Sequence, residues 1–132
     1  YEIGLSEFSY RDQISLLAYS PLAQGYLTGK YLDGARPEGA RTTLFNRGQR
    51  YETPHAEKII KKYMQLANEY HLDPALMALA FVNQQEFVTS NIIGATNMDQ
   101  LELAIKSFST TLSKELIEKI NSIHLECPNP CP

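Results

Sequence analysis

Glycine, hydroxyl and basic residues gather in two stretches of the sequence whose composition suits a bound anion. The first is residues 20–30, which begins with a serine and ends with Lys30, and the second is Gly94-Ala95-Thr96-Asn97. A helix that starts after a glycine and beside a hydroxyl directs free N–H groups and the positive end of its dipole toward an anion. Lys30, and Arg41 further along, supply positive charge for the opposite side. Either stretch alone is equally consistent with a turn followed by a helix cap.

Each stretch follows an apolar run that predicts a buried strand. Residues 14–19 are apolar apart from Ser15, and polar residues bound them on both sides, which is typical of a strand buried on both faces. Pro21 has no N–H and cannot continue a central ladder, so we expect the Ser20 hydroxyl to lie beyond the carboxyl edge. Residues 87–93 repeat the pattern and end at Gly94. Parallel α/β folds bind ligands at this edge, so the two strands predict one shared binding site.

A long connection, residues 20–53, separates the first strand from the helices. Structureless connections of this length are uncommon in compact domains and are usually functional or disordered. Apolar and aromatic residues within it predict that it packs, which favours a functional lid or cofactor-binding belt. These residues are Tyr26, Leu27, Tyr31, Leu44, Phe45 and Tyr51.

The helices after this connection are predicted by apolar residues at spacings of three and four and by recognisable start signals. Those signals are Thr53-Pro54, Asp73-Pro74, Asn97 with Gln100, and Ser113. Residues 1–10 predict the end of a helix that starts earlier, and the first residue is Tyr1 rather than methionine, so we expect a fragment of a longer polypeptide.

Alternation of strands with helices predicts an α/β fold with parallel strands joined by right-handed crossovers. Two strands cannot form a stable parallel sheet, since both faces and both edges need cover. The sequence therefore predicts one arc of a larger α/β structure, completed by more of the same polypeptide or by a partner chain. An apolar strand edge left open predicts self-association.

Composition excludes several classes of protein. With 43% hydrophobic and 20% charged residues, the chain resembles an average globular domain. The net charge of −3 and the dispersed lysines argue against nucleic-acid binding. No run has the length of a transmembrane helix and the first ten residues lack the regions of a signal peptide, so we expect a cytoplasmic protein.

The cysteines Cys127 and Cys131 lie in a tail that reads ECPNPCP. Its prolines prevent a helix, so the two thiols do not share a helical face. A tetrahedral zinc site needs two further ligands and only His124 is near, which disfavours a metal. A local disulfide remains an alternative to the favoured interpretation, a flexible tail over residues 126–132 with free thiols.

Several motifs together resemble the aldo-keto reductases, and most of all the Tas-like bacterial branch that is related to the voltage-gated potassium channel β subunits. They are AYSPLAQGYLTGKY at 18–31, GAR at 39–41, TLFNR at 43–47, LDPALMALAFV at 72–82 and IIGATNMDQL at 92–101. The resemblance implies a (β/α)8 TIM barrel that binds NADPH at its carboxyl end and reduces aldehydes and ketones. It makes residues 14–19 the seventh strand and residues 87–93 the eighth, so that residues 1–132 are a single region, the C-terminal part of the barrel.

The resemblance also assigns the cofactor-binding residues. Tyr19 would stack near the nicotinamide, and Lys30 would meet phosphate. Arg41 would clamp the 2′-phosphate, which favours NADP over NAD. The pyrophosphate loop would be lined by Ser20, Leu22 and Gly25, and the adenosine end would be held by Gly94, Thr96 and Gln100.

One departure from the family is the Glu-Asn pair that contacts adenine, which is replaced here by Leu103-Ala104. Its loss removes about 1–2 kcal/mol of hydrogen bonding to the adenine amino group.

The catalytic Asp, Tyr, Lys and His of the family lie on earlier strands and loops, outside this chain. We therefore expect no catalytic residue here, no metal, and no activity from the 132-residue chain alone. The histidines His55, His71 and His124 are interpreted as structural, the last on an apolar stripe. Glu115 and Glu118 are interpreted as part of a solvated helix face rather than a carboxylate pair.

Three functions stay open on these grounds. The favoured one is the NADPH-binding C-terminal part of an aldo-keto reductase, whose complete form takes a small carbonyl substrate. The second is a redox sensor that holds NADP without turnover. The third is a non-catalytic truncated relic.

Overall fold

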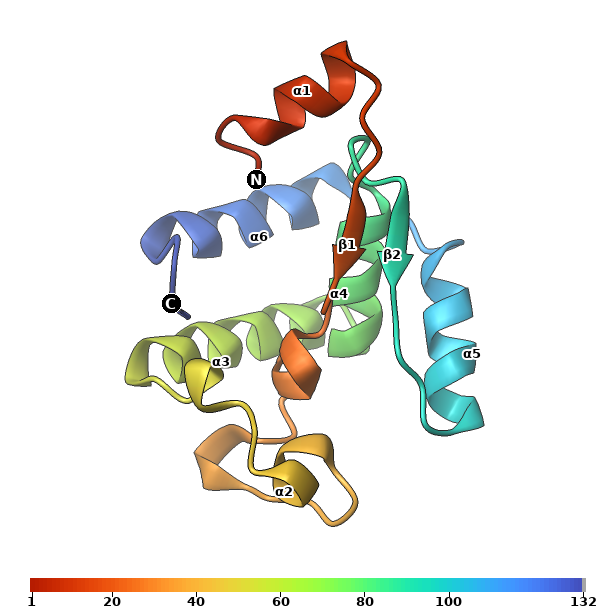
Figure 1. Ribbon diagram of the computed structural model, residues 1–132. Coiled ribbons are helices and arrows are strands. Elements are labelled where there is room, and N and C mark those ends of the chain that lie inside the picture. Colours follow the sequence, from red (N-terminus) through yellow and green to blue (C-terminus); the bar gives the residue numbers. More distant parts are fainter. Residues whose placement is uncertain (132) are drawn as a thin grey trace.

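Two short parallel strands lie at the centre of the structure (Figure 1). In this computed structural model, which describes residues 1–131, β1 (Leu17–Tyr19) pairs with β2 (Ser90–Ile92). The register pairs Leu17 with Ser90 and Tyr19 with Ile92. The chain is an α/β structure with the predicted parallel pairing.

Helices account for most of the remaining chain. In chain order these are α1 (Leu5–Arg11), the 3-10 helices η1 (Ala23–Thr28) and η2 (Leu32–Gly34), α2 (Arg41–Phe45), the 3-10 helix η3 (Gln49–Tyr51), α3 (Pro54–Glu69), α4 (Pro74–Asn83), α5 (Met98–Ser107) and α6 (Lys114–Glu126). The helices from α3 onward begin where the sequence predicted. Their cap side chains accept backbone N–H groups, Thr53 from Ala56, Asp73 from Ala75 and Leu76, Asn97 from Gln100, and Ser113 from Leu116.

Two apolar clusters hold these elements together. The main core lies between α3, α4 and α6 and contains Leu66, Ala67, Met77, Ala80, Leu112, Leu116 and Ile120. Burying one large side chain of this kind stabilises a fold by about 1.5–3 kcal/mol. The second cluster attaches the 20–53 connection to α3 and contains Tyr26, Tyr31, Ala40, Ala56 and Ile60. The prediction that the connection packs is confirmed, although Leu44 and Phe45 are exposed.

The prediction of strands buried on both faces is wrong for this chain. Leu17 is 58% and Tyr19 is 78% exposed, because within residues 1–131 no layer covers that side of the sheet. Asn91, on the opposite side, is buried and donates to Asn83 of α4. The strands are also shorter than the predicted 14–19 and 87–93, since each has the other as its sole strand partner in the described chain.

The carboxyl-terminal segment returns to the start of α3. Thr53 Oγ1 donates to the carbonyl oxygen of Pro130 at 3.0 Å, and Cys131 packs against the second cluster. Glu126, the first residue of the predicted flexible tail, belongs to α6, and Pro132 lies outside the described residues. Flexibility of the intervening residues stays a prediction.

Both cysteines are free thiols, and burial raises the pKa of Cys131. Within residues 1–131 no three His, Cys, Asp or Glu side chains gather closely enough to hold a metal ion. Over the same residues, every helix is too short or too polar to cross a bilayer.

Candidate functional site

The two anion-suited stretches leave the sheet at the same edge. Tyr19 and Ile92 are register partners at the ends of the two strands, so the chain passes into Ser20 on one side and toward Gly94 on the other (Figure 1). Ligands of parallel α/β folds bind at this carboxyl edge. The strand pairing therefore places the starts of both stretches at one end of the sheet.

The backbone directly after β1 is strained. Ser20 has a φ of 57°, and Gln24 also has 57°, both in the left-handed region that non-glycine residues rarely adopt. A short turn holds the segment, because Ala23 N–H donates to the Ser20 carbonyl at 2.9 Å. Strain of this kind concentrates at ligand-binding segments, where the surrounding structure maintains it.

Lys30 folds back over Gly25. A Cβ atom built at Gly25 would lie 2.9 Å from Lys30 Cε and 3.1 Å from Lys30 Nζ, and the Gly25 φ of +97° also disfavours other residues. The ammonium group lies 5.2 Å from the centre of the Tyr31 ring. Glycine at position 25 thus leaves the space that the lysine side chain uses.

Arg41 is the first residue of α2 and is exposed to solvent. Within the described residues neither Arg41 nor Lys30 forms an ion pair, whereas Arg36 is paired with Glu52 and Lys61 with Asp33. Two cations without a carboxylate partner can attract an anionic ligand.

The second stretch forms a closed cap at the start of α5. Gln100 Oε1 accepts from the Thr96 N–H at 2.9 Å, and Asn97 Oδ1 accepts from the Gln100 N–H at 2.9 Å. Gly94 is exposed, and a Cβ atom there would meet nothing within 4 Å. The backbone at Gly94 is therefore open to a ligand. Asp99, in the first turn of α5, carries a negative charge that repels an anion there.

Leu103-Ala104, the departure from the family pattern, lies on the packed side of α5. Ala104 is buried, and α5 makes extensive contact with α4. This position contributes apolar packing in place of hydrogen bonds.

A network around Tyr26 was missed by the sequence analysis. The Tyr26 hydroxyl donates to Glu52 Oε1 at 2.6 Å, and Arg36 donates to the same oxygen at 2.7 Å. Burial, followed by the hydrogen bond to Glu52, raises the pKa of Tyr26. The sequence signal was the recurrence of tyrosine at 26, 31 and 51, whose rings lie side by side with Tyr26 in the middle.

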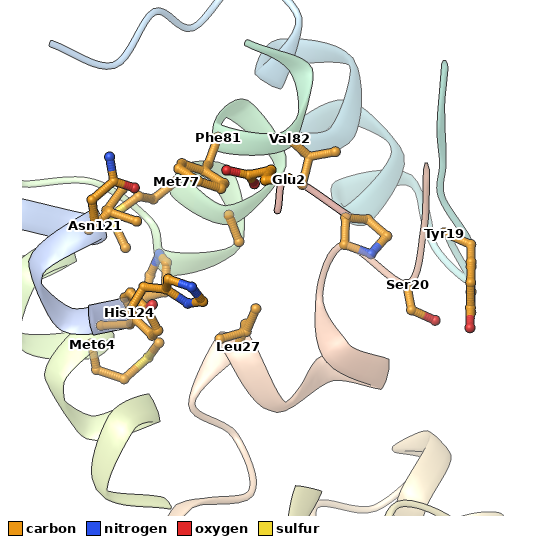
Figure 2. Close-up of a pocket in the computed structure, with 15 residues that line it drawn as sticks. Glu2, Tyr19, Ser20, Leu27, Met64, Met77, Phe81, Val82, Asn121 and His124 are labelled. Carbon is orange, nitrogen blue, oxygen red and sulfur yellow. The ribbon is translucent and has the colours of Figure 1, made fainter. Parts of the chain in front are cut away.

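A cavity of about 380 Å³ lies between β1, α3, α4 and α6 (Figure 2). Most of its wall is apolar, including Met64, Met77 and Phe81, while Tyr19 and Ser20 lie at one end. It includes no lysine or arginine, so it is not the place where phosphate would bind.

His124 is exposed and lines this cavity beside Ile120, which belongs to the same predicted apolar stripe of α6. Tyr63 lies in the same wall, and burial raises its pKa. Of the predicted cofactor-binding residues, Tyr19 and Ser20 line the cavity, and the others lie outside it.

Parallel strands joined through helical crossovers define an α/β protein. Residues 2–125 match the aldo/keto reductase family, and the chain belongs to this family, within its Tas-like branch.

Two known proteins illustrate the relationship. The chain is 47% identical to protein tas of Escherichia coli over 132 residues, which is 100% of this chain and 38% of that protein. It is 33% identical over 112 residues to a putative voltage-gated potassium channel subunit beta of Schizosaccharomyces pombe, covering 80% of this chain and 32% of that one. The chain thus spans less than half the length of these relatives.

The solved structure of a glycerol dehydrogenase from Gluconobacter oxydans is similar in fold. Its TM-score is 0.73 at 21% identity, over 99% of this chain and 40% of that chain. At this level of identity the similarity concerns the fold alone.

Proposed function

We propose that the chain is the NADPH-binding C-terminal part of an aldo-keto reductase barrel, with β1 and β2 as its seventh and eighth strands. The observation that carries the proposal is the register of Tyr19 with Ile92, which brings the Ser20 and Gly94 segments to one carboxyl edge. Family membership and the fold of the glycerol dehydrogenase support the same interpretation.

The residues at the edge fit a dinucleotide. The Tyr19 ring is 78% exposed and offers a flat apolar surface to the nicotinamide. Lys30 and the segment around Gly25 would receive the pyrophosphate, and Arg41 the 2′-phosphate. The space in front of Gly94 admits a close approach of the ligand to the backbone.

The bound cofactor would supply a hydride to the carbonyl carbon of an aldehyde or ketone. The residues of this chain would hold and orient it: Tyr19 would fix the ring plane, and the cations would neutralise the phosphates. Protonation of the carbonyl oxygen would require a group elsewhere in the complete protein.

A redox sensor that binds NADP without turnover is the second candidate. The observation in its favour is the similarity to a protein named as a potassium channel β subunit. The two functions share the cofactor site and differ in turnover.

The proposal predicts that Arg41→Ala selectively weakens NADPH binding. We expect at least about a tenfold loss, the equivalent of one charge-assisted hydrogen bond of about 1.5–3 kcal/mol, with NADH affinity unchanged. Fluorescence titration with each nucleotide measures both affinities. Arg11→Ala is the matched control, because Arg11 forms an exposed pair with Glu7 on α1.

An equal loss for NADH, or no loss at all, would contradict the role of Arg41. A test aldehyde then separates the functions. NADPH oxidation by the full-length protein supports a reductase, binding without oxidation supports a sensor, and no binding supports a relic. Turnover by the 132-residue chain alone would show that the catalytic residues lie within it.

A further inference from the structure

Tyr31 contacts the segments that carry the two cations assigned to the phosphates, Lys30 itself and Thr42 next to Arg41. Its side chain is 5% exposed, and its ring centre lies 4.6 Å from that of Tyr26 in the second cluster. It is adjacent in sequence to Lys30 and in space to the start of α2, where Arg41 lies. The sequence predicts for Tyr31 only a part in packing the 20–53 connection.

The Tyr31 hydroxyl takes the place of a helix cap for α2. The N-cap residue Ala40 has no side-chain oxygen, and the Thr42 N–H donates to the Tyr31 hydroxyl at 3.2 Å. Thr42 is buried, so without this acceptor its N–H would lose its partner away from water. The hydroxyl therefore fixes the first turn of α2 next to Arg41.

The Tyr31 ring confines Lys30 from the other side. Lys30 Nζ lies 5.2 Å from the ring centre, within the range of a cation–π contact. A Cβ atom at Gly25 would lie 3.1 Å from Lys30 Nζ and 3.5 Å from Tyr31 Cε2. The lysine side chain thus lies against both the Gly25 backbone and the ring.

We propose that Tyr31 is the positioning residue for both phosphate-binding cations. The ring orients Lys30, the hydroxyl orients Arg41 through α2, and the rigid side chain sets the distance between them. This role rests on the proposed NADPH site. It explains how one buried residue positions two cationic side chains from separate segments. Tyr31 itself does not contact the cofactor.

Two substitutions in the full-length protein separate the effect of the Tyr31 ring from the effect of its hydroxyl. Tyr31→Phe keeps the ring, so we expect NADPH affinity to fall between about twofold and about tenfold, the equivalent of one hydrogen bond, and NADH affinity to stay within about twofold. Tyr31→Leu also removes the ring, and both affinities should fall. Tyr70→Phe is the control, because Tyr70, at the end of α3, likewise makes a hydrogen bond and a cation–π contact, both with residues of α6.

Amide hydrogen exchange supplies a readout that needs no nucleotide. In Tyr31→Phe the Thr42 amide should exchange faster than in the wild type, and in Tyr70→Phe it should not change. If the wild type binds neither nucleotide, the proposed function fails, and faster exchange at Thr42 still supports the link to α2. Unchanged NADPH preference in Tyr31→Phe when the wild type binds, or unchanged exchange at Thr42, overturns the proposal.

Discussion

Individual glycines in residues 20–34 differ in how much space surrounds them as well as in backbone conformation. Gly25 and Gly34 both have positive φ, +97° and +75°, but their surroundings differ. At Gly25 a Cβ atom would lie 2.9 Å from Lys30 Cε, whereas at Gly34 nothing lies within 4 Å. The two glycines therefore form a natural pair for separating backbone strain from displacement of Lys30.

We predict that Gly25→Ala and Gly34→Ala destabilise the protein by similar amounts, about 1–2 kcal/mol from the left-handed backbone. Only Gly25→Ala should also weaken NADPH binding, because it displaces Lys30. Urea unfolding measures the first effect and nucleotide titration the second. Equal nucleotide affinities in the two variants would show that the position of Lys30 is unimportant for binding.

Among single residues, the sequence predicted the helix caps well, but it did not predict the contact of Tyr31 with α2. Thr53 and Asp73 carry their signal locally, in a short polar side chain followed by proline. Tyr31 acts on α2 through a contact between segments, with Thr42. No local sequence pattern predicts a tyrosine that takes the place of the N-cap side chain of a helix in another segment.

Among the elements, the junction of α3 with α6 carries a charge cluster that makes stability depend on pH. The hydroxyl of Tyr70, the residue that follows α3, donates to Glu115 Oε1 at 2.7 Å, and Lys119 Nζ lies 3.5 Å from the same oxygen. These two neighbours, Tyr70 first, hold the pKa of Glu115 below its ordinary value of 4.5. A depressed carboxyl pKa favours the folded state above 4.5, and this contribution is lost as the pH falls through the folded-state pKa.

We predict that Glu115→Gln makes the loss of stability on acidification shallower below pH 4.5. Because the group is exposed, the effect should be small. Urea unfolding at a series of acidic pH values measures it. Glu118→Gln, one turn away and without an ion pair in the described chain, is the control and should leave the slope unchanged.

Helices were also easier to predict than strands. The backbone hydrogen bonds of an amphipathic helix such as α6 form within the helix itself. The spacing of its apolar residues is therefore enough to predict it. The extent of β1 depends on neighbouring strands, and within residues 1–131 only β2 is present to pair with it. Residues 14–16 and 87–89 lie outside the two strands, although the Thr89 N–H donates to the Leu16 carbonyl at the start of the ladder.

The short helices inside residues 20–53 were also hard to predict, because they lack apolar residues at helical spacing. Their form depends on positive φ at residues such as Gly29 and Asp33, and on packing of Tyr26 and Tyr31 against α3. The sequence predicted that the connection packs and bears cations. It did not predict the turns that place them.

For the molecule as a whole, one face of the sheet is open and neither outer edge has a strand partner within the described residues. Leu17 and Tyr19 point to that face, and β1 uses one edge for β2. Exposed apolar strands with unpaired N–H and C=O groups associate readily. The expected occupant is the remainder of the barrel or, for the 132-residue chain alone, a second copy.

We predict that the isolated chain forms dimers or larger assemblies and that Leu17→Lys weakens them. The charge would have to be desolvated against the partner surface, which opposes association. Light scattering over a range of concentrations provides the measurement. Ile105→Lys, an equally exposed apolar position on α5, is the control. A wild-type chain that stays monomeric at high concentration would contradict the prediction.

The pairing of β1 with β2 also has a consequence for synthesis on the ribosome. Register partners in the two strands, such as Leu17 and Ser90, are separated by 73 positions in the chain. At translation rates of 5–20 residues per second, β1 emerges roughly 4–15 s before β2 can pair with it. During that interval the nascent chain can form α3 and α4, whose contacts are local, so we expect helix packing to precede the sheet and nascent β1 to be a natural target for chaperones.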